Sequence, residues 1–267
     1  MTANLELQRV KEWGGLRGFA NLFHKENRAW WGTRRWWINA LLWSVLLDGL
    51  ILVIMLFAPS EGPNQATEAK IAQAGAQIFF QFGASILAIG TVILAQDLIL
   101  GEKQNGVVEW LLSKPVVRRS YVLAKLAANA LPELVLLVGL PSILAYGMFS
   151  LRTGVPFPLA PFLSAVGIMT VHSLFYLTLT LMLGTIFNNR AAILGIALGS
   201  ALGGNILGGL VNPLFYVTPW VLPNVALSTA TSQAIPVEMG LASLIATVLW
   251  SLVFILVALW KFEKTEL

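Results

Sequence analysis

Long apolar runs, separated by short polar segments, dominate this sequence and restrict what it can fold into. A helix of about 20 residues crosses the hydrocarbon core of a bilayer, which is about 30 Å thick, and several of the runs reach that length. Only 11% of the residues are charged and 57% are hydrophobic, whereas soluble domains are about 25% charged. The sequence therefore predicts an all-α polytopic membrane protein. A β-barrel would show alternation within segments of about 10 residues, and the runs do not alternate.

The apolar runs predict six transmembrane helices, at about residues 37–58, 75–100, 120–149, 161–187, 191–211 and 240–260. Pro132 and Pro141 interrupt the third run. Residues 212–238 are apolar but broken by four prolines, which favours short re-entrant helices on the outer face over a seventh span. This layout divides the chain into an N-terminal segment (1–36), a transmembrane domain (37–260) and a tail (261–267).

The distribution of Lys and Arg predicts the orientation in the membrane. The N-terminal segment, the loops after the second and fourth spans, and the tail are rich in these residues, whereas the other side has only Lys70 and Arg152. By the positive-inside rule, both termini are expected to be cytoplasmic. The first thirty residues are polar and mixed in charge, which is not the pattern of a secretory signal. Because the positive charge is explained by orientation, it does not indicate nucleic-acid binding.

Two segments outside the spans predict amphipathic helices. Residues 16–37 combine aromatic and aliphatic side chains with basic ones, which favours an interfacial helix on the membrane surface over a simple anchor before the first span. Residues 102–113, within "GEKQNGVVEWLLSKP", predict a cytoplasmic helix of about three turns that ends before Pro115. Its apolar side is expected to carry Val107, Val108, Leu111 and Leu112.

The second of these segments also carries a recognisable pattern. It reads E-x-x-x-G-x-x-E-x-L-L-S-x-P-V-x-R, which is satisfied by Glu102, Gly106, Glu109, Leu111, Leu112, Ser113, Pro115, Val116 and Arg118. It resembles the first cytoplasmic loop of ABC-2 type permeases, and "YVLAKLAANALPELV" is similar to the start of their third span, with Lys125 in the usual place. The layout of the spans extends the resemblance over nearly the whole chain.

The resemblance implies a transmembrane subunit of an exporter with the type V architecture. Two permease copies, identical or different, would form the pathway, and residues 102–113 would act as a coupling helix that docks on a nucleotide-binding ATPase subunit. The residues implied in docking are Glu102, Gly106, Val107, Val108, Glu109, Trp110, Leu111, Leu112, Ser113, Pro115 and Arg118. We expect the aliphatic face and Trp110 to bury against that subunit, with Glu102, Glu109 and Arg118 pairing at the rim.

The ATPase that would drive transport is expected to be a separate chain. The sequence has no Gly-x-x-x-x-Gly-Lys-Ser/Thr stretch, the P-loop that holds ATP phosphates. ATP and Mg²⁺ would therefore be bound by the partner, and no cofactor, metal or catalytic residue is predicted in this chain. The implied location is a prokaryotic cytoplasmic membrane, in contact with lipid. The alternative function is an ATP-independent secondary carrier or channel, which would be expected to show internal repeats that are not evident here.

Four polar side chains within the predicted spans are candidates for the pathway or for contacts between helices, namely Asp48, Glu133, His172 and Asn205. The two carboxyl groups either form a cation- or proton-responsive site in the pathway or hold helices together. The second interpretation is favoured for Asp48, and both stay open for Glu133. His172 is expected to form a hydrogen bond between helices rather than to bind a metal, because the spans contain no second histidine. Asn205 adds a candidate interhelical hydrogen bond.

The fifth span contains a glycine stripe. Gly195, Gly199 and Gly203 recur every four residues, and Gly204 and Gly208 repeat the spacing one position further on. Such a face lets the backbones of two membrane helices approach closely. The stripe is expected to pack either within one subunit or at the contact between two subunits.

Overall fold

The computed structural model describes residues 15–57, 65–211, 213–233 and 237–264, and all regular structure in these ranges is helical. This confirms the predicted all-α class. The elements in chain order are α1 (Phe19–Trp31), α2 (Arg35–Phe57), α3 (Gln65–Gln77), η1 (Ile78–Phe82), α4 (Gly83–Ala95), α5 (Leu100–Gln104), α6 (Val107–Leu112), α7 (Arg118–Glu133), η2 (Leu134–Gly139), α8 (Leu140–Thr153), α9 (Leu159–Ile186), α10 (Arg190–Leu210), α11 (Leu214–Val217), η3 (Pro219–Val221), α12 (Leu222–Ala230) and α13 (Val237–Lys264).

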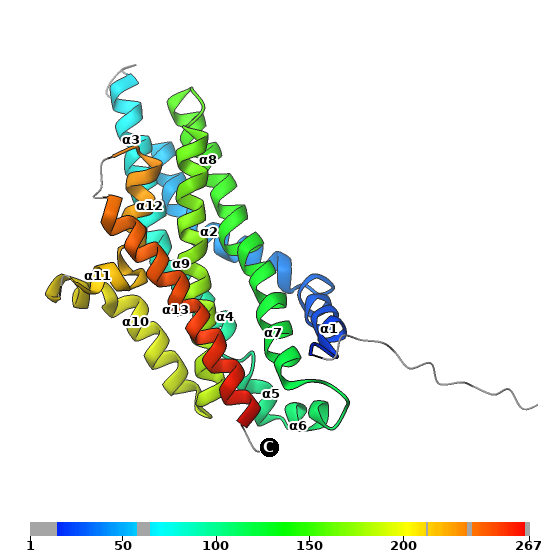
Figure 1. Cartoon of the computed structure of the whole chain (residues 1–267). Coiled ribbons are helices and arrows are strands. Elements are labelled where there is room, and N and C mark those ends of the chain that lie inside the picture. The colour runs from blue at the N-terminus through cyan, green and yellow to red at the C-terminus, as the bar shows by residue number, and fades with distance from the viewer. Residues whose placement is uncertain (1–14, 58–64, 212, 234–236, 265–267) are drawn as a thin grey trace, which may run out of the picture.

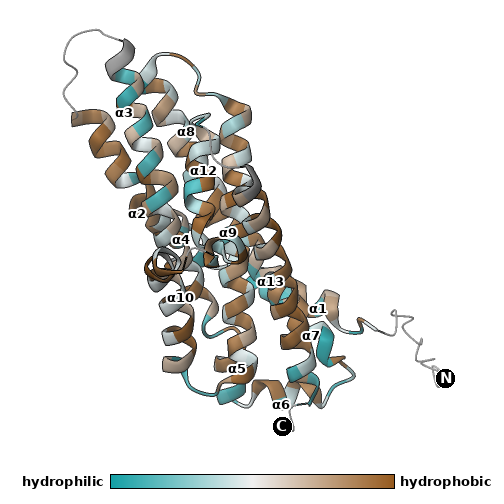
Figure 2. Ribbon diagram, turned by 60° about the vertical axis from the view of Figure 1, so that its left-hand side comes forward, coloured by the Kyte–Doolittle hydropathy of each residue, from teal (hydrophilic) through white to brown (hydrophobic). Residues whose placement is uncertain are grey.

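The long helices run back and forth along a single bundle, and the short helices α1, α5 and α6 gather at one end of it (Figure 1). We call this the α6 end. The C-terminal end of α13 lies at the α6 end as well, so the first and last described helices meet on the same side of the bundle (Figure 1). Figure 2 shows apolar residues along most of the bundle, with hydrophilic stretches on α3 and around the loops at the α6 end.

Five of the described helices are long and apolar enough to cross a membrane, and one further apolar helix is shorter. The five are Arg35–Phe57, Glu68–Gln104, Arg118–Thr153, Leu159–Ile186 and Met239–Lys264, and the shorter one is Arg190–Gly204. The second begins before the predicted residue 75, because α3 starts at Gln65 in a segment rich in Ala and Gln. These residues have high helix propensity, so the helix extends beyond the apolar run.

The third predicted span is not broken by its prolines. Proline lacks an amide hydrogen and crowds the carbonyl four residues earlier, so a regular α-helix cannot continue through it. Here Pro132 is the second-last residue of α7, Pro141 is the second residue of α8, and the π-helical η2 lies between the two helices. The wider π-helix absorbs the disturbed hydrogen bonds, and the helix continues from Arg118 to Thr153.

The prediction of one amphipathic helix at 102–113 is wrong. The structure forms two short helices, α5 and α6, because Gly106 between them has a φ of +67°. A residue with a Cβ avoids this left-handed conformation, whereas glycine adopts it readily. The turn at Gly106 gives α5 and α6 different axes, so their side chains do not form one continuous face.

The proline-rich segment after α10 forms the short helices α11, η3 and α12. Their re-entrant position on the outer face stays a prediction. Residues 212 and 234–236 of this segment lie outside the described residues. The α12 helix packs against α9, α13 and η1. It therefore closes the side of the bundle between the end of α10 and the start of α13.

Candidate functional site

A buried lysine, Lys125, joins three helices at the α6 end. The Lys125 ammonium of α7 lies 3.0 Å from Glu26 Oε1 of α1 and 2.9 Å from Glu102 Oε1 of α5, and its side chain is only 6% exposed. These two contacts join residues that are far apart in the sequence. Lys125 therefore attaches both the N-terminal helix and the segment before α6 to the third long helix.

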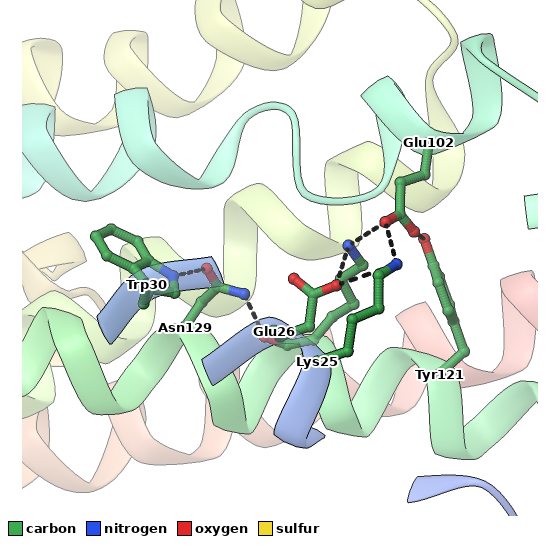
Figure 3. A network of polar contacts seen from close by, with 7 residues as sticks. Lys25, Glu26, Trp30, Glu102, Tyr121 and Asn129 are labelled. Atoms are coloured by element: carbon green, nitrogen blue, oxygen red, sulfur yellow. Dashed lines mark hydrogen bonds and ion pairs between the residues drawn. The ribbon is translucent and has the colours of Figure 1, made fainter. Parts of the chain in front are cut away.

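Two further groups complete this charged cluster. The Tyr121 hydroxyl donates a hydrogen bond of 2.7 Å to Glu102 Oε2, and the Lys25 ammonium lies 3.5 Å from Glu102 Oε1 (Figure 3). The cluster holds two ammonium groups and two carboxylates, so its formal charges cancel. A buried ion pair is tolerated when its remaining polar atoms are also bonded, and both oxygens of Glu102 meet this condition.

One turn further along α7, Asn129 makes a second attachment to α1. The Trp30 indole donates a hydrogen bond of 2.8 Å to Asn129 Oδ1, and Asn129 Nδ2 donates one of 2.8 Å to the carbonyl of Lys125 (Figure 3). Trp30 and Asn129 are both buried. The apolar side of α1 thus packs against protein, not only against a membrane surface.

The α5 helix also holds the end of α9. The Lys103 ammonium lies 3.0 Å from the Thr185 carbonyl, 3.4 Å from the Gly184 carbonyl and 3.2 Å from Asn188 Oδ1. The last carbonyls of a helix have no amide partner within the helix and carry partial negative charge, so a lysine there satisfies and stabilises them. Beside it, Arg190 pairs with Asp97, which ties the start of α10 to the same segment.

The start of α7 is joined to the end of α13. Arg118 Nη1 donates to the carbonyls of Glu263, at 2.8 Å, and Phe262, at 3.4 Å. Arg119 forms an ion pair with the Glu263 carboxylate. Together with Lys103 and Lys125, these contacts connect the α5–α6 segment and its flanks to α1, α7, α9, α10 and α13.

The α6 helix presents a different face to solvent from the predicted one. Val108 is 0% exposed and Leu111 6%, and both pack with Leu22, Tyr121 and Phe262 of the same chain. Leu112 is half-buried at the edge of this cluster. The expectation that Val108 and Leu111 bury against a partner is therefore wrong, because the chain's own helices already cover them.

The exposed side of this segment is polar and aromatic. Trp110 is 61% exposed, and the Lys114 ammonium lies 3.6 Å from the centroid of its ring. Glu109, Ser113 and Pro115 are exposed beside them. We call Glu109, Trp110, Ser113, Lys114 and Pro115 the α6 tip. Of the residues predicted to contact a partner, those that are exposed to solvent lie in the α6 tip.

Glu102 and Arg118 were expected to pair with a partner subunit, but both side chains bond to groups of the same chain. Glu102 is bonded to Lys125, Tyr121 and Lys25, and Arg118 to carbonyls at the end of α13. Sequence reasoning missed the roles of Lys25, Glu26, Tyr121 and Asn129. The repetition of polar residues every four positions along α7, at Tyr121, Lys125, Asn129 and Glu133, was the available signal.

The intramembrane polar residues do not come together in one site. Glu133 of α7 accepts hydrogen bonds from Thr91 of α4 and Ser173 of α9. Asp48 is 5% exposed, and neither carboxyl oxygen has a hydrogen-bond partner among the described residues. His172 Nδ1 lies 3.3 Å from the Pro219 carbonyl, so this histidine joins α9 to η3. The side chain of Asn205 lies outside what the structure describes.

The glycine stripe of α10 divides into two faces. A Cβ on Gly204 would lie 2.2 Å from the Trp220 ring, and a Cβ on Gly208 would lie 2.4 Å from the Phe215 ring. Aromatic side chains of the same subunit therefore pack directly against these two glycines. No atom of the described residues lies within 4 Å of a Cβ built on Gly195, Gly199 or Gly203.

These features define a polytopic helical membrane protein whose long helices are linked at one end by buried and capping charges. Residues 20–267 match the family described as ABC-2 family transporter protein, and the chain belongs to this family. The resemblance to an ABC-2 type permease, the membrane component of an ABC transporter, is thereby confirmed. A comparison with curated proteins found no match.

Proposed function

We propose that this chain is the permease subunit of an exporter that moves its substrate across a prokaryotic cytoplasmic membrane. A separate nucleotide-binding subunit hydrolyses the ATP and holds the Mg²⁺. Membership of the ABC-2 family supports the transport role. The lack of a P-loop in the sequence supports a division of labour between two chains.

The α6 tip is the observation that carries this proposal. It combines an exposed tryptophan with charged neighbours, and buried tryptophans are frequent centres of binding energy in protein interfaces. Its base is fixed by the burial of Val108 and Leu111. A force applied to the tip therefore reaches α7 through Glu102 and Lys125, and α9 through Lys103.

Substitution of Trp110 tests the proposal. The full chain with Trp110→Ala, co-expressed with the ATPase and reconstituted in lipid, is expected to lose at least tenfold in affinity for the ATPase, since a central interface tryptophan contributes about 2 kcal/mol or more. Trp36→Ala is the matched control, because Trp36 is also exposed but lies at the start of α2. Normal transport and normal co-purification of the ATPase with Trp110→Ala would sink the proposal. Transport without ATP would favour a carrier or channel instead.

A second permease copy completes the proposed pathway. The open glycine face of α10 supports a contact between subunits, because Gly195 and Gly199 are exposed and Ile196, Leu202 and Ile206 beside them are exposed as well. Close helix approach along such a face is a common mode of membrane association. Gly199→Cys is expected to form a disulfide-linked dimer when this chain is expressed alone if the pair is a homodimer. A crosslink that requires a second permease indicates a heterodimer.

The proposed topology has six spans, with α10 as the fifth and both termini in the cytoplasm. The position of α1, α6 and the end of α13 at one end of the bundle supports this arrangement (Figure 1). A cysteine introduced at Ser113 is expected to react with an impermeant reagent only from the cytoplasmic side. A cysteine at Val155, between α8 and α9, is expected to react only from the outside.

A further inference from the structure

Three side-chain oxygens from three different helices converge in the interior of the bundle. The Thr91 hydroxyl of α4 lies 2.7 Å from Glu133 Oε1 of α7 and 3.2 Å from the Ser173 hydroxyl of α9, which also bonds to Glu133 Oε1. All three residues are buried, with Glu133 only 4% exposed. We call Glu133, Thr91 and Ser173 the interior oxygen cluster.

The carboxyl group of this cluster has no cationic side chain to balance it. Among the described residues, no ion pair includes Glu133. The cation nearest to it along α7 is Lys125, eight residues earlier, and this ammonium is bonded to Glu26 and Glu102. His172 is next to Ser173 in α9, but its ring faces the Pro219 carbonyl. A bare carboxylate in the interior of a membrane protein is costly, so this group either carries a proton or is balanced by a cation from outside the chain.

A small cavity lies beside the carboxyl group. It has a volume of about 10 Å³ and is lined by Glu133, Thr91, Asn129 and Trp30 together with Leu94, Ala95, Leu98 and Leu177. This volume is sufficient for one particle of the size of a water molecule. An organic ammonium ion is therefore too large for it.

We propose that the interior oxygen cluster binds one small monovalent metal cation, with sodium as the probe. A single carboxylate balances a single positive charge, and the hydroxyl oxygens supply neutral ligands. Calcium takes six to eight oxygen ligands, often from several carboxylates, whereas Glu133 is the one carboxylate that lines this cavity. A bound cation joins α4, α7 and α9, and Trp30 of α1 covers the cavity. This inference goes beyond the proposed function and does not depend on it.

Direct sodium binding tests the proposal. The purified full chain in lipid nanodiscs is expected to bind radioactive sodium at one site per chain, with choline unable to compete. Glu133→Gln is expected to weaken binding at least a hundredfold, because the amide removes the balancing charge. Thr91→Val is expected to weaken it about tenfold, because it removes the hydroxyl that lines the cavity beside Glu133. Ser173→Ala is also expected to weaken it about tenfold, because it removes the hydroxyl that is bonded to Glu133 Oε1. No ATPase or transport is needed, so failure here is distinct from failure of the proposed function.

Two matched controls separate the site from general effects. Thr180→Val removes a buried hydroxyl of α9 that bonds only to the Tyr176 carbonyl among the described residues, and Asp48→Asn neutralises a buried carboxyl outside the cluster. Both are expected to bind sodium as the unmodified chain does. If Glu133→Gln does not fold, the Thr91 and Ser173 variants still test the site. Absence of sodium binding in the unmodified chain, as for a carboxyl that only carries a proton, overturns the proposal, as does unchanged binding in all three cluster variants.

Discussion

The Lys125 ammonium lies 2.9 Å from Glu102 Oε1, although one residue belongs to the third long helix and the other to the segment before α6. The same ammonium reaches Glu26 of α1 at 3.0 Å. A movement of the α5–α6 segment therefore cannot occur without displacing α7 and α1 or breaking a buried ion pair. Under the proposed function, this connection would carry the movement of the ATPase subunit into the membrane domain.

Removal of the Lys125 charge is expected to destabilise the chain strongly. Lys125→Met removes the buried partner of Glu26 and Glu102 and leaves them only the more exposed Lys25. Breaking a buried ion pair from one side costs about 3–5 kcal/mol. Thermal or denaturant unfolding of the purified chain measures this loss. Arg119→Ala is the control, because its pair with Glu263 is exposed to solvent and an exposed ion pair contributes little to stability. A Lys125→Met chain as stable as Arg119→Ala would contradict the assigned role.

The hydrogen bond between Trp30 and Asn129 is expected to contribute to the attachment of α1. Trp30→Phe keeps an aromatic ring but removes the indole donor, which leaves Asn129 Oδ1 buried without its 2.8 Å partner. Such a loss costs about 1–3 kcal/mol. A double-mutant cycle with Asn129→Leu measures the coupling between the two residues. Strictly additive effects would show that the bond does not contribute to stability.

The turn between α5 and α6 is expected to require glycine at position 106 because of the backbone conformation, not because a side chain would clash there. A Cβ at this position meets no atom within 4 Å, but φ is +67°. Gly106→Ala is therefore expected to cost about 1–2 kcal/mol through backbone strain and to shift the α6 tip relative to α5. Unfolding measurements and co-purification of the ATPase report the two effects.

Gly101→Ala provides the matched control for this prediction. Gly101 is helical, and its Cβ would make an ordinary contact of 3.6 Å with Asp97 Cβ. Alanine has the higher helix propensity, so stability is expected to be unchanged or slightly raised. Equal behaviour of the two alanine variants would refute the conformational requirement at Gly106.

The two faces of α10 are expected to respond differently to added volume. Gly204→Ala places a Cβ 2.2 Å from the Trp220 ring, and relief of such overpacking typically costs about 1–3 kcal/mol. Gly199→Ala meets no atom of the described chain within 4 Å and is expected to leave the stability of the single subunit unchanged. Unfolding of the monomeric chain in detergent compares the two. A larger loss of stability for Gly199→Ala than for Gly204→Ala would contradict the assignment of Gly199 to the open face of α10.

The sequence by itself determined the class of the protein. Long apolar runs can satisfy their backbone hydrogen bonds in a membrane as helices, so the all-helical fold follows from local pattern. The pattern from Glu102 to Arg118 was sufficient to indicate the ABC-2 family, and the family match confirmed it. The glycine spacing in α10 and the two prolines Pro132 and Pro141 also indicated where these helices have small residues or a change of helix type. Both signals act within a few residues along the chain.

Only the tertiary structure decided what each polar or apolar face touches. The spacing of Val108 and Leu111 shows that they avoid water, but an apolar face packs equally well on the same chain, on lipid or on a partner. Their burial against Leu22 and Phe262 could not be read from the pattern. The partners of Lys125 and Glu133 depend on contacts between residues distant in sequence. The positive φ at Gly106 sets the direction of α6. Such contacts depend on how the helices pack in three dimensions, and local periodicity carries no information about that packing.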